Sequence, residues 1–579
     1  MDLIEHFTSV YVLDFEFLAN DGERQHPICL VYKELISGTE CRMWIEEGAA
    51  CPFPTDSSAL FVGYFASAEW GCFLSLSWEL PQRCIDLYAE YRLIMNGRAD
   101  IQKYGLLDAA RSFGIPPMET SHKIEMRDLI IVGGPWSEAE RVDILEYCAQ
   151  DVALTVQVFG ALWANLNSSI QTLSQALFRG RFTCAVARME FAGIPVDTGL
   201  LAQLHLYRED ILKRLISTID ADFRVYEGTS FKHELFRRWV CQEGISWPLT
   251  DTRRLKIDDD TFKLMSLAHP KIVPLHQLRK TVGQLRQIKL TVGLDGRNRA
   301  LLSPFGSKTG RNQPSTTKFI FGNAAWLRSL IKPDPGFGLA YIDFSSQEIA
   351  IAAALSGDRK MWQAYTSGDP YMAFAIQAGL APAGATKATH KDVRNRCKQV
   401  VLGVGYGMGA ETMAIAAGIH VVDARALLQS HKQTYRKFWE WAETNQMRAM
   451  MGDPLITPLG WRIEIRRALD VNARSLLNWP MQSTGADMMR LAACLLTEGG
   501  IEVCAPVHDA FLVRFHLELE SEIVPRAQEI MMQASEQVMG ADYQCRVDAE
   551  IIRSPDRYVD ERGVEMFEVV RTTLAELET

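Results

Sequence analysis

Two aspartates stand where a side chain can leave a buried strand and do chemistry. Asp343 closes the apolar run GLAYID, and Asp509 follows His508 between the apolar runs EVCAPV and AFLVRF. A carboxylate at a strand end can reach a metal ion while the strand holds its backbone. Two such groups are the minimum cage for two Mg²⁺ ions, which would support an in-line displacement at a triphosphate.

A basic helix face could hold that triphosphate. Arg394, Lys398 and Leu402 recur at every fourth position of VRNRCKQVVLGVGYG, ahead of Tyr406 and Gly407. Cations one turn apart form a rail for phosphates, since arginine can make a two-pronged contact and lysine acts as a mobile point charge. Tyr406, one further turn along, would offer an aromatic face on which a base can stack.

A second group of acids lies near the beginning of the chain. Asp14 and Glu16 are two residues apart in YVLDFEF, so a strand would place both on one face. Their carboxylates could then bind one divalent cation. Tyr147 and Asp151 are one helical turn apart in EYCAQD. Carboxylates from several elements around two metal ions would suit hydrolysis of a phosphodiester at a DNA end.

The elements that must position these residues can be followed along the chain. The first 160 residues alternate apolar runs with helical stretches, which predicts an α/β domain, and 165–300 is mostly helical. We expect a strand at 339–343, a helix to about 356–357, a helix-rich insertion at 358–450 and a tight strand pair at 504–515. Ser345 and Glu348 have the spacing of a capping box, so helix capping is one role open to Glu348.

Length and composition describe a multidomain chain without a membrane segment. Its 579 residues imply about three to five structural units. No stretch approaches the roughly 20 apolar residues that span a bilayer, so a cytoplasmic location is expected. Twelve cysteines without a C-x-x-C pair predict neither disulfides nor structural zinc.

The charge distribution predicts a nucleic-acid surface on an acidic protein. The net charge is −10, yet residues 276–332 hold eleven lysines and arginines against one acid, Asp295. A phosphate backbone responds to local charge, so this run predicts a basic surface, with a solvated helix face as the alternative. The eleven residues are Arg279, Lys280, Arg286, Lys289, Arg297, Arg299, Lys308, Arg311, Lys318, Arg328 and Lys332.

The segments around Asp343, Arg394 and Asp509 resemble motifs A, B and C of family A DNA polymerases, the Klenow-type and related phage enzymes. They follow one another along the chain in the order of these motifs. The resemblance extends over nearly the whole chain. It implies an α/β multidomain fold, an RNase H-like exonuclease domain followed by a right-hand polymerase. The implied boundaries are 1–165 for the exonuclease-like domain, 166–310 for the thumb and the start of the palm, 311–357 and 456–579 for the palm, and 358–455 for the fingers.

The resemblance also implies a role for each motif residue. Asp343 and Asp509 would bind the catalytic metal ions, and Glu348 would be the steric gate against a ribose 2′-hydroxyl. The residues implied in dNTP binding are Arg394, Lys398, Leu402, Tyr406 and Glu348. The residues implied in DNA binding are Arg311 in SKTGRNQPS, Arg474, Asn478 and Gln482 in RSLLNWPMQSTGAD, His508 in motif C, and Lys280 and Arg286 in the thumb.

The first 160 residues resemble a proofreading 3′→5′ exonuclease domain of the four-carboxylate type. Asp14 and Glu16 match its first motif, and Tyr147 with Asp151 its third. The middle motif is represented only by Glu69, without the usual asparagine and aromatic helpers, so a surface acid at a helix start is the alternative for this residue. A vestigial exonuclease is a second reading of the domain. Because the resemblance begins within the first dozen residues, no 5′-nuclease domain is expected.

Two positions depart from the family pattern. Ala510 replaces the acid of the HDE motif, and Leu402 stands where relatives usually carry phenylalanine or tyrosine. We expect chemistry to survive, with altered primer-end positioning or metal affinity and altered nucleotide selection.

Three kinds of protein remain to be separated. A single-subunit RNA polymerase shares motifs A to C, but Glu348 and the exonuclease-like segment count against it, and the retained aspartates and cations disfavour a DNA-binding scaffold without chemistry. The expected activity is template-directed DNA synthesis with proofreading, in phage DNA replication. The expected protein is a monomer that binds primer–template DNA and dNTPs and uses two Mg²⁺ ions per site, with Mn²⁺ able to substitute.

Overall fold

A computed structural model describes residues 6–98, 100–116, 120–166, 168–286, 288–405, 407–465 and 473–578 of the chain. The chain divides into two compact units. Unit 1 holds 1–193, 302–313 and 338–551, and unit 2 holds 194–301, 314–337 and 552–579. Each unit is therefore assembled from three separate segments of the chain.

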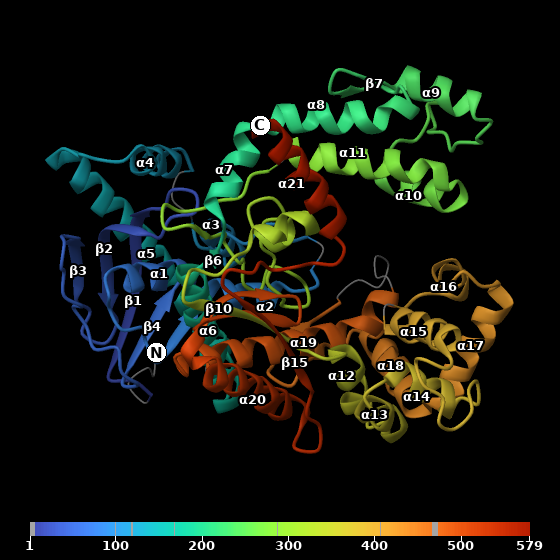
Figure 1. Cartoon of the computed structure of the whole chain (residues 1–579). Coiled ribbons are helices and arrows are strands. Elements are labelled where there is room, and N and C mark those ends of the chain that lie inside the picture. Colours follow the sequence, from blue (N-terminus) through green and yellow to red (C-terminus); the bar gives the residue numbers. More distant parts are fainter. Residues whose placement is uncertain are drawn as a thin grey trace. The chain divides into compact units, whose positions relative to one another are not determined.

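Unit 1 begins with a five-stranded sheet in the order β3-β2-β1-β4-β5, drawn in blue in Figure 1. Its central strand β1 pairs antiparallel with β2 and parallel with β4. This mixed arrangement agrees with the RNase H-like sheet that was expected for the first domain. The strands are β1 Ser9–Leu18, β2 His26–Glu34, β3 Glu40–Trp44, β4 Ala59–Gly63 and β5 Cys84–Asp86.

Apolar residues of β1 are buried on both faces of this sheet. Val10 and Val12 belong to a core shared with α5, whereas Leu13 and Phe15 belong to a second core shared with α1. Helices thus cover both faces, as the continuous apolar run of β1 requires. The helices of this part are α1 Ser67–Ser75, α2 Leu87–Met95, α3 Leu106–Ser112, α4 Thr120–Val132, α5 Glu138–Leu166 and α6 Ile170–Ala192.

Helix α6 joins this sheet to the rest of unit 1. A Cβ added at its Gly180 would lie 1.9 Å from the carbonyl oxygen of Cys84 in β5, so only glycine allows this approach of helix and strand. The same helix packs against α19 and β13.

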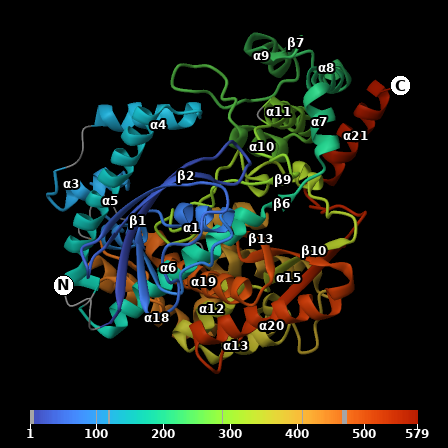
Figure 2. The ribbon, with the colours of Figure 1, turned by 90° about the vertical axis from the view of Figure 1, so that its left-hand side faces the viewer.

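A second sheet of unit 1 has the order β13-β14-β10-β15. Helix α19 packs against β13 (Figure 2), and α20 packs against β14. The sheet confirms the strand predicted at 339–343 and the strand pair predicted at 504–515. The bounds are β10 Phe337–Phe344, β13 Glu502–Val507, β14 Ala510–His516, β15 Val547–Arg553, α12 Gln347–Ser356, α19 Ala473–Glu498, η7 Leu517–Leu519 and α20 Glu520–Met539.

Between α12 and α19 the chain is mostly helical, which confirms the predicted insertion. Helix α14 packs against α15, and α15 packs against α16 and α17. The elements are α13 Arg359–Thr366, α14 Pro370–Gln377, α15 Lys391–Gly405, α16 Ala410–Ala417, α17 Val421–Thr434, α18 Arg436–Met450, β11 Leu455–Ile456 and β12 Arg462–Ile463.

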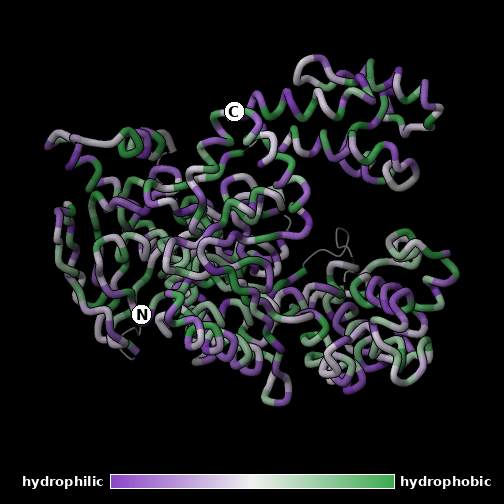
Figure 3. Tube along the Cα trace, viewed as in Figure 1, coloured by the Kyte–Doolittle hydropathy of each residue, from purple (hydrophilic) through white to green (hydrophobic). Residues whose placement is uncertain are grey.

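Unit 2 is also mostly helical. Its helices α8 and α11 pack side by side, and hydrophilic and hydrophobic residues alternate along both of them (Figure 3). The segment between them has a core of its own around Phe236, Trp247 and Phe262. The elements are β6 Ile194–Pro195, α7 Thr198–Leu206, α8 Arg208–Ile219, η2 Asp220–Asp222, β7 Tyr226–Glu227, β8 Ser230–Phe231, α9 His233–Gln242, α10 Asp259–Ala268, η3 Pro270–Ile272, α11 Val273–Arg286, β9 Arg297–Asn298, η4 Ile320–Gly322, η5 Ala325–Leu330 and α21 Val564–Glu578.

All twelve cysteines are free thiols. Over the described ranges, no helix has both the length and the apolar character needed to cross a membrane.

Candidate active site

Strands β10 and β14 bring Asp343 and Asp509 together. Val507 pairs with Ala510, so His508 and Asp509 form the two-residue turn of the hairpin, and His508 has the positive φ of 57° that such a turn needs. The backbone nitrogen of Phe344 donates to the carbonyl oxygen of Asp509 at 3.1 Å. The two predicted metal-binding aspartates therefore lie at adjacent ends of neighbouring strands.

A third acid stands on the other side of β10. Burial and the negative charges of Asp509 and Asp548 raise the pKa of Asp343 to about 6. Asp548 is on β15, and the Ser345 hydroxyl donates a hydrogen bond to its carboxylate. Asp548 was not among the predicted site residues, although its segment V-D-A-E places two acids on one strand face, as YVLDFEF does.

Ala510, which replaces the acid of the HDE motif, is fully buried. It begins β14 next to Asp509. The carboxylates near Asp343 therefore come from β10, the hairpin turn and β15. Within the described ranges they do not form a group whose three ligand atoms all lie within 4.8 Å of one another.

Glu348 contacts another predicted site residue instead of capping its helix. The N-cap of α12 is Ser346, in the left-handed region at φ 53°, and no side chain caps it. The capping box of Ser345 and Glu348, the alternative role for Glu348, is not formed, because the Ser345 hydroxyl donates to Asp548. Gln482 Nε2 donates to Glu348 Oε1 at 2.6 Å, so motif A and α19 meet at the proposed sugar gate.

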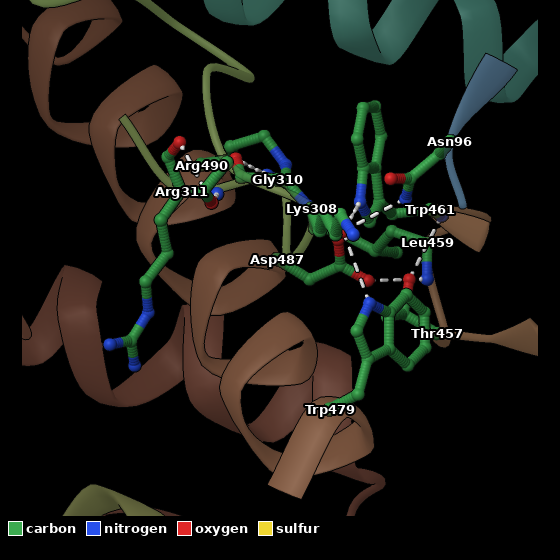
Figure 4. A network of polar contacts seen from close by, with 11 residues as sticks. Asn96, Lys308, Gly310, Arg311, Thr457, Leu459, Trp461, Trp479, Asp487 and Arg490 are labelled. Atoms are coloured by element: carbon green, nitrogen blue, oxygen red, sulfur yellow. Dashed lines mark hydrogen bonds and ion pairs between the residues drawn. The ribbon is translucent and has the colours of Figure 1, made fainter. Parts of the chain in front are cut away.

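A polar network fixes the loop that carries Arg311 (Figure 4). The carbonyl oxygen of Lys308 accepts hydrogen bonds from Asn96 Nδ2 at 2.8 Å and from the indoles of Trp461 and Trp479, both at 3.1 Å. Arg490 donates to the Gly310 carbonyl at 2.7 Å. With the backbone held on both sides, the Arg311 side chain extends away from the network.

Helix α15 confirms that Arg394, Lys398 and Leu402 share one helix. Arg394 Nε donates to Asp369 Oδ2 at 2.5 Å. Its guanidinium carbon lies 5.2 Å from the ring centre of Tyr371, and Lys398 Nζ lies 5.9 Å from the same centre. The predicted phosphate rail thus faces the beginning of α14. Tyr406 falls outside the described residues.

A cavity of about 40 Å³ lies next to α15. Leu402 and Glu348 both line it, together with apolar residues of α13 and α18 and the buried His431. Burial lowers the pKa of His431 to about 3, so this imidazole is neutral at physiological pH. Leu402, at the position where the family resemblance implies an aromatic ring, therefore borders unfilled space beside the proposed gate.

The remaining residues predicted to bind DNA in this region lie on α19. Arg474 is in the first turn, but its side chain falls outside the described part of the molecule. Asn478 is half-buried one turn further along, and Gln482 follows at the next turn, where it reaches Glu348.

The predicted exonuclease residues form a second cluster in unit 1. Asp14 and Glu16 are half-buried on β1, and Tyr147 and Asp151 are buried on α5. Burial raises the pKa of Tyr147 most, and the negative charges of Asp151, Glu16 and Asp14 raise it further. All four residues therefore face one site.

Glu69 belongs to this cluster and is not a surface acid. It lies in the first turn of α1 with 4% of its surface exposed, and its Oε2 accepts a hydrogen bond from the Phe15 nitrogen at 2.8 Å. Burial and the charge of Asp14 raise its pKa well above the usual range.

Cys148 was not predicted to contribute to this site. Its thiol donates to the Asp14 carbonyl oxygen at 3.2 Å, and Asp14, Glu16 and Cys148 offer three ligand atoms within 4.8 Å of one another. No other group in the described residues meets this distance. Asp86 caps α2 by accepting a hydrogen bond from the Tyr88 nitrogen.

The predicted basic surface at 276–332 is wrong for four of its eleven residues. Arg297, Arg299 and Arg328 are ion-paired with acids and have at most 12% of their side chains exposed, and Arg279 is packed between Phe231 and Phe262. The partner acids are Asp334, Asp295 and Asp560, two of which lie outside the run. The exposed members are Lys280, Arg286, Lys289, Lys308 and Lys318.

Comparison with known proteins finds similarity to one family over part of the chain. Residues 318–554 match the model of DNA polymerase family A. The DNA polymerase of Mycobacterium phage D29 is 27% identical over 284 residues, which is 46% of this chain and 45% of the relative. The thermostable DNA polymerase I of Thermus aquaticus is 23% identical over 537 residues, which is 83% of this chain and 61% of the relative. The chain thus spans about half to three-fifths of these relatives.

A solved structure shares the fold over almost the whole chain. It is the POL domain of Pol1 from M. smegmatis, in a complex with DNA primer-template and dNTP, with a TM-score of 0.70 and 17% sequence identity over 95% of this chain and 97% of that chain. The likeness confirms the predicted fold class, while the predicted subdomain boundaries stay predictions. The two aspartates at the ends of β10 and of the β13–β14 hairpin both lie within residues 318–554, the part of the chain that is similar to DNA polymerase family A.

Proposed function

We propose that the chain is a template-directed DNA polymerase that adds dNTPs to a primer 3′-hydroxyl. The observation that carries this proposal is the meeting of Asp343 and Asp509 at the ends of neighbouring strands, inside the region that matches DNA polymerase family A. The similarity to the phage D29 polymerase supports a role in phage DNA replication.

The carboxylates at β10 fit hard divalent cations. Like charges crowded around Asp343 favour a cation, which oxygen ligands of this kind hold well. Two Mg²⁺ ions, when bound, would activate the primer hydroxyl and offset the negative charge of the triphosphate. Asp343 and Asp509 would hold these ions, with Mn²⁺ able to replace Mg²⁺.

The other predicted residues would position the substrates. Arg394 and Lys398 would orient the triphosphate, and Glu348, fixed by Gln482, would reject a 2′-hydroxyl. The residues proposed to hold the primer–template are Arg311, Arg474, Asn478, Gln482, His508, Lys280 and Arg286. Tyr406 and Leu402 would contact the base and sugar of the incoming nucleotide.

Substitution of the two aspartates tests this function. Asp343→Asn or Asp509→Asn should lower the rate of primer extension with Mg²⁺ by about 100-fold or more, since several kcal/mol of charge stabilisation are lost. Duplex binding should persist. Asp453→Asn, which removes an exposed acid paired with Arg448, is the matched control. Extension at the wild-type rate would overturn the metal assignment, and equal use of NTPs and dNTPs would favour an RNA polymerase.

We infer a second activity, 3′→5′ exonuclease proofreading, for the site of Asp14 and Glu16. The convergence of Glu69, Tyr147 and Asp151 on this pair supports it, because these are the residues of all three exonuclease motifs. The joint change Asp14→Ala and Glu16→Ala should remove degradation of a mismatched primer end and leave extension intact. A wild-type protein that degrades no mismatched end would identify the domain as vestigial.

A further inference from the structure

Arg394 already has an anion as its partner. Its Nε binds Asp369 Oδ2 at 2.5 Å, and the two side chains are 15% and 31% exposed, so a solute can reach the pair. Charge-assisted hydrogen bonds of this length are the contacts that arginine also makes to phosphate. The carboxylate therefore occupies a group that the proposed function assigns to the triphosphate.

Asp369 is well placed to do this without disturbing the fold. It is the N-cap of α14, where its other oxygen, Oδ1, accepts a hydrogen bond from the Met372 nitrogen at 3.2 Å. One oxygen thus holds the helix and the second holds Arg394. The two roles can be separated, because asparagine caps a helix as well as aspartate does but has no charge.

Tyr371, two residues further on, faces both cations of α15. Arg394 and Lys398 lie 5.2 and 5.9 Å from its ring centre, within the range of cation–π attraction. Burial raises the pKa of Tyr371, and the nearby side chain of Ser346, the N-cap of the helix that carries Glu348, partly offsets this rise. The start of α14 thus contacts both the proposed phosphate ligands and the helix of the proposed sugar gate.

We propose that Asp369 is a positioning residue that holds Arg394 until a triphosphate displaces it, and that it thereby sets the affinity for the incoming nucleotide. This inference rests on the proposed function of Arg394. A triphosphate has more negative charge than one carboxylate, so it can win the exchange. The Asp369 carboxylate raises the concentration of nucleotide that the exchange requires, and an anion with fewer charges competes less well for Arg394.

Steady-state primer extension with the Asp369→Asn protein tests the exchange. With the competing charge removed, the KM for dNTP should fall about two- to fivefold, the range expected for a partly exposed ion pair, while kcat changes less. Glu411→Gln removes one charge from another ion pair of the same helical region, that with Arg425, and should leave KM unchanged. An unchanged melting temperature for Asp369→Asn would show that the helix cap is kept.

The Arg394→Gln protein separates failure of this inference from failure of the proposed function. Arg394→Gln should raise KM, and Asp369→Asn should have no further effect in that background. If Arg394→Gln leaves KM unchanged, the role of Arg394 and the inference both fall. If Arg394→Gln raises KM but Asp369→Asn alone leaves it unchanged or raises it, Asp369 does not compete with the nucleotide and the inference is overturned.

Discussion

At the scale of single residues, the crowding of carboxylates around Asp343 makes metal binding depend on pH. Burial and the charges of Asp509 and Asp548 raise its pKa to about 6 in the free protein. The folded-state pKa is above the ordinary value for aspartate, so ionised Asp343 destabilises the fold above pH 6, and protonation relieves this as the pH falls. A divalent cation relieves the same repulsion, but only where the carboxylate is ionised.

We therefore expect Mg²⁺ to stabilise the protein at pH 7.5 and to lose this effect as the pH falls through 6. At about 100 times its dissociation constant, a ligand that binds only the folded state adds about 2.7 kcal/mol to the free energy of unfolding. Thermal unfolding with and without Mg²⁺, at constant ionic strength, measures the difference. The Asp343→Asn protein should show a much smaller Mg²⁺ effect than the wild type at pH 7.5, and an equal effect of Mg²⁺ at pH 5 and 7.5 in the wild type would contradict the prediction.

At this scale, the sequence predicts residues at the end of a strand and residues that share one face of a strand. Asp343, Asp509, Asp14 and Glu16 follow from apolar runs and strand alternation alone. Asp548 could not be chosen from the sequence, because only the strand order places β15 beside β10. Likewise, the partner of Glu348 is Gln482, 134 residues further along the chain, and no local pattern gives that contact.

At the scale of elements, the contact of α6 with β5 depends on one missing side chain. The Gly180→Ala change would place a Cβ 1.9 Å from the Cys84 carbonyl oxygen, so helix and strand must separate. Overpacking of this kind costs about 1–3 kcal/mol or more in the free energy of unfolding. Chemical denaturation should detect the loss.

Gly283 in α11 provides the matched control. It is also a helical glycine, but a Cβ built there meets nothing within 4 Å. Gly283→Ala should stabilise the protein by about 0.5–1 kcal/mol, because alanine loses less backbone freedom than glycine on folding. Destabilisation of similar size in both variants would show that the close approach of Gly180 to Cys84 does not decide the effect.

Helices and strands follow from the sequence more readily than the contacts between distant segments do. The helical character of 165–300 and the hairpin around Asp509 follow from periodicity and turn length. The basic run at 276–332 is less exposed than its composition predicts, because acids elsewhere in the chain pair with some of its arginines. Arg297 and Arg328 find their acids, Asp334 and Asp560, outside that run.

At the scale of the whole molecule, an acidic chain is proposed to bind an acidic polymer. Binding must then depend on the few exposed cations, and each phosphate contact contributes about −0.9 to the slope of log K against log salt concentration. The joint change Lys280→Gln and Arg286→Gln should make this slope less steep by about 2. Arg299→Gln should leave it unchanged, because Arg299 is paired with Asp295 and only 6% exposed. Titration of a labelled duplex at several salt concentrations measures both, and an unaltered slope in the double variant would exclude this face as a DNA contact.

The division of unit 1 into three chain segments also matters on the ribosome. Helix α6 emerges early, whereas α19, against which it packs, is made only after residue 473 has been added. At about 5–20 residues per second, the apolar face of α6 waits for tens of seconds before its partner exists. The nascent chain should therefore need a chaperone in that interval, and a fragment that stops after α6 should aggregate.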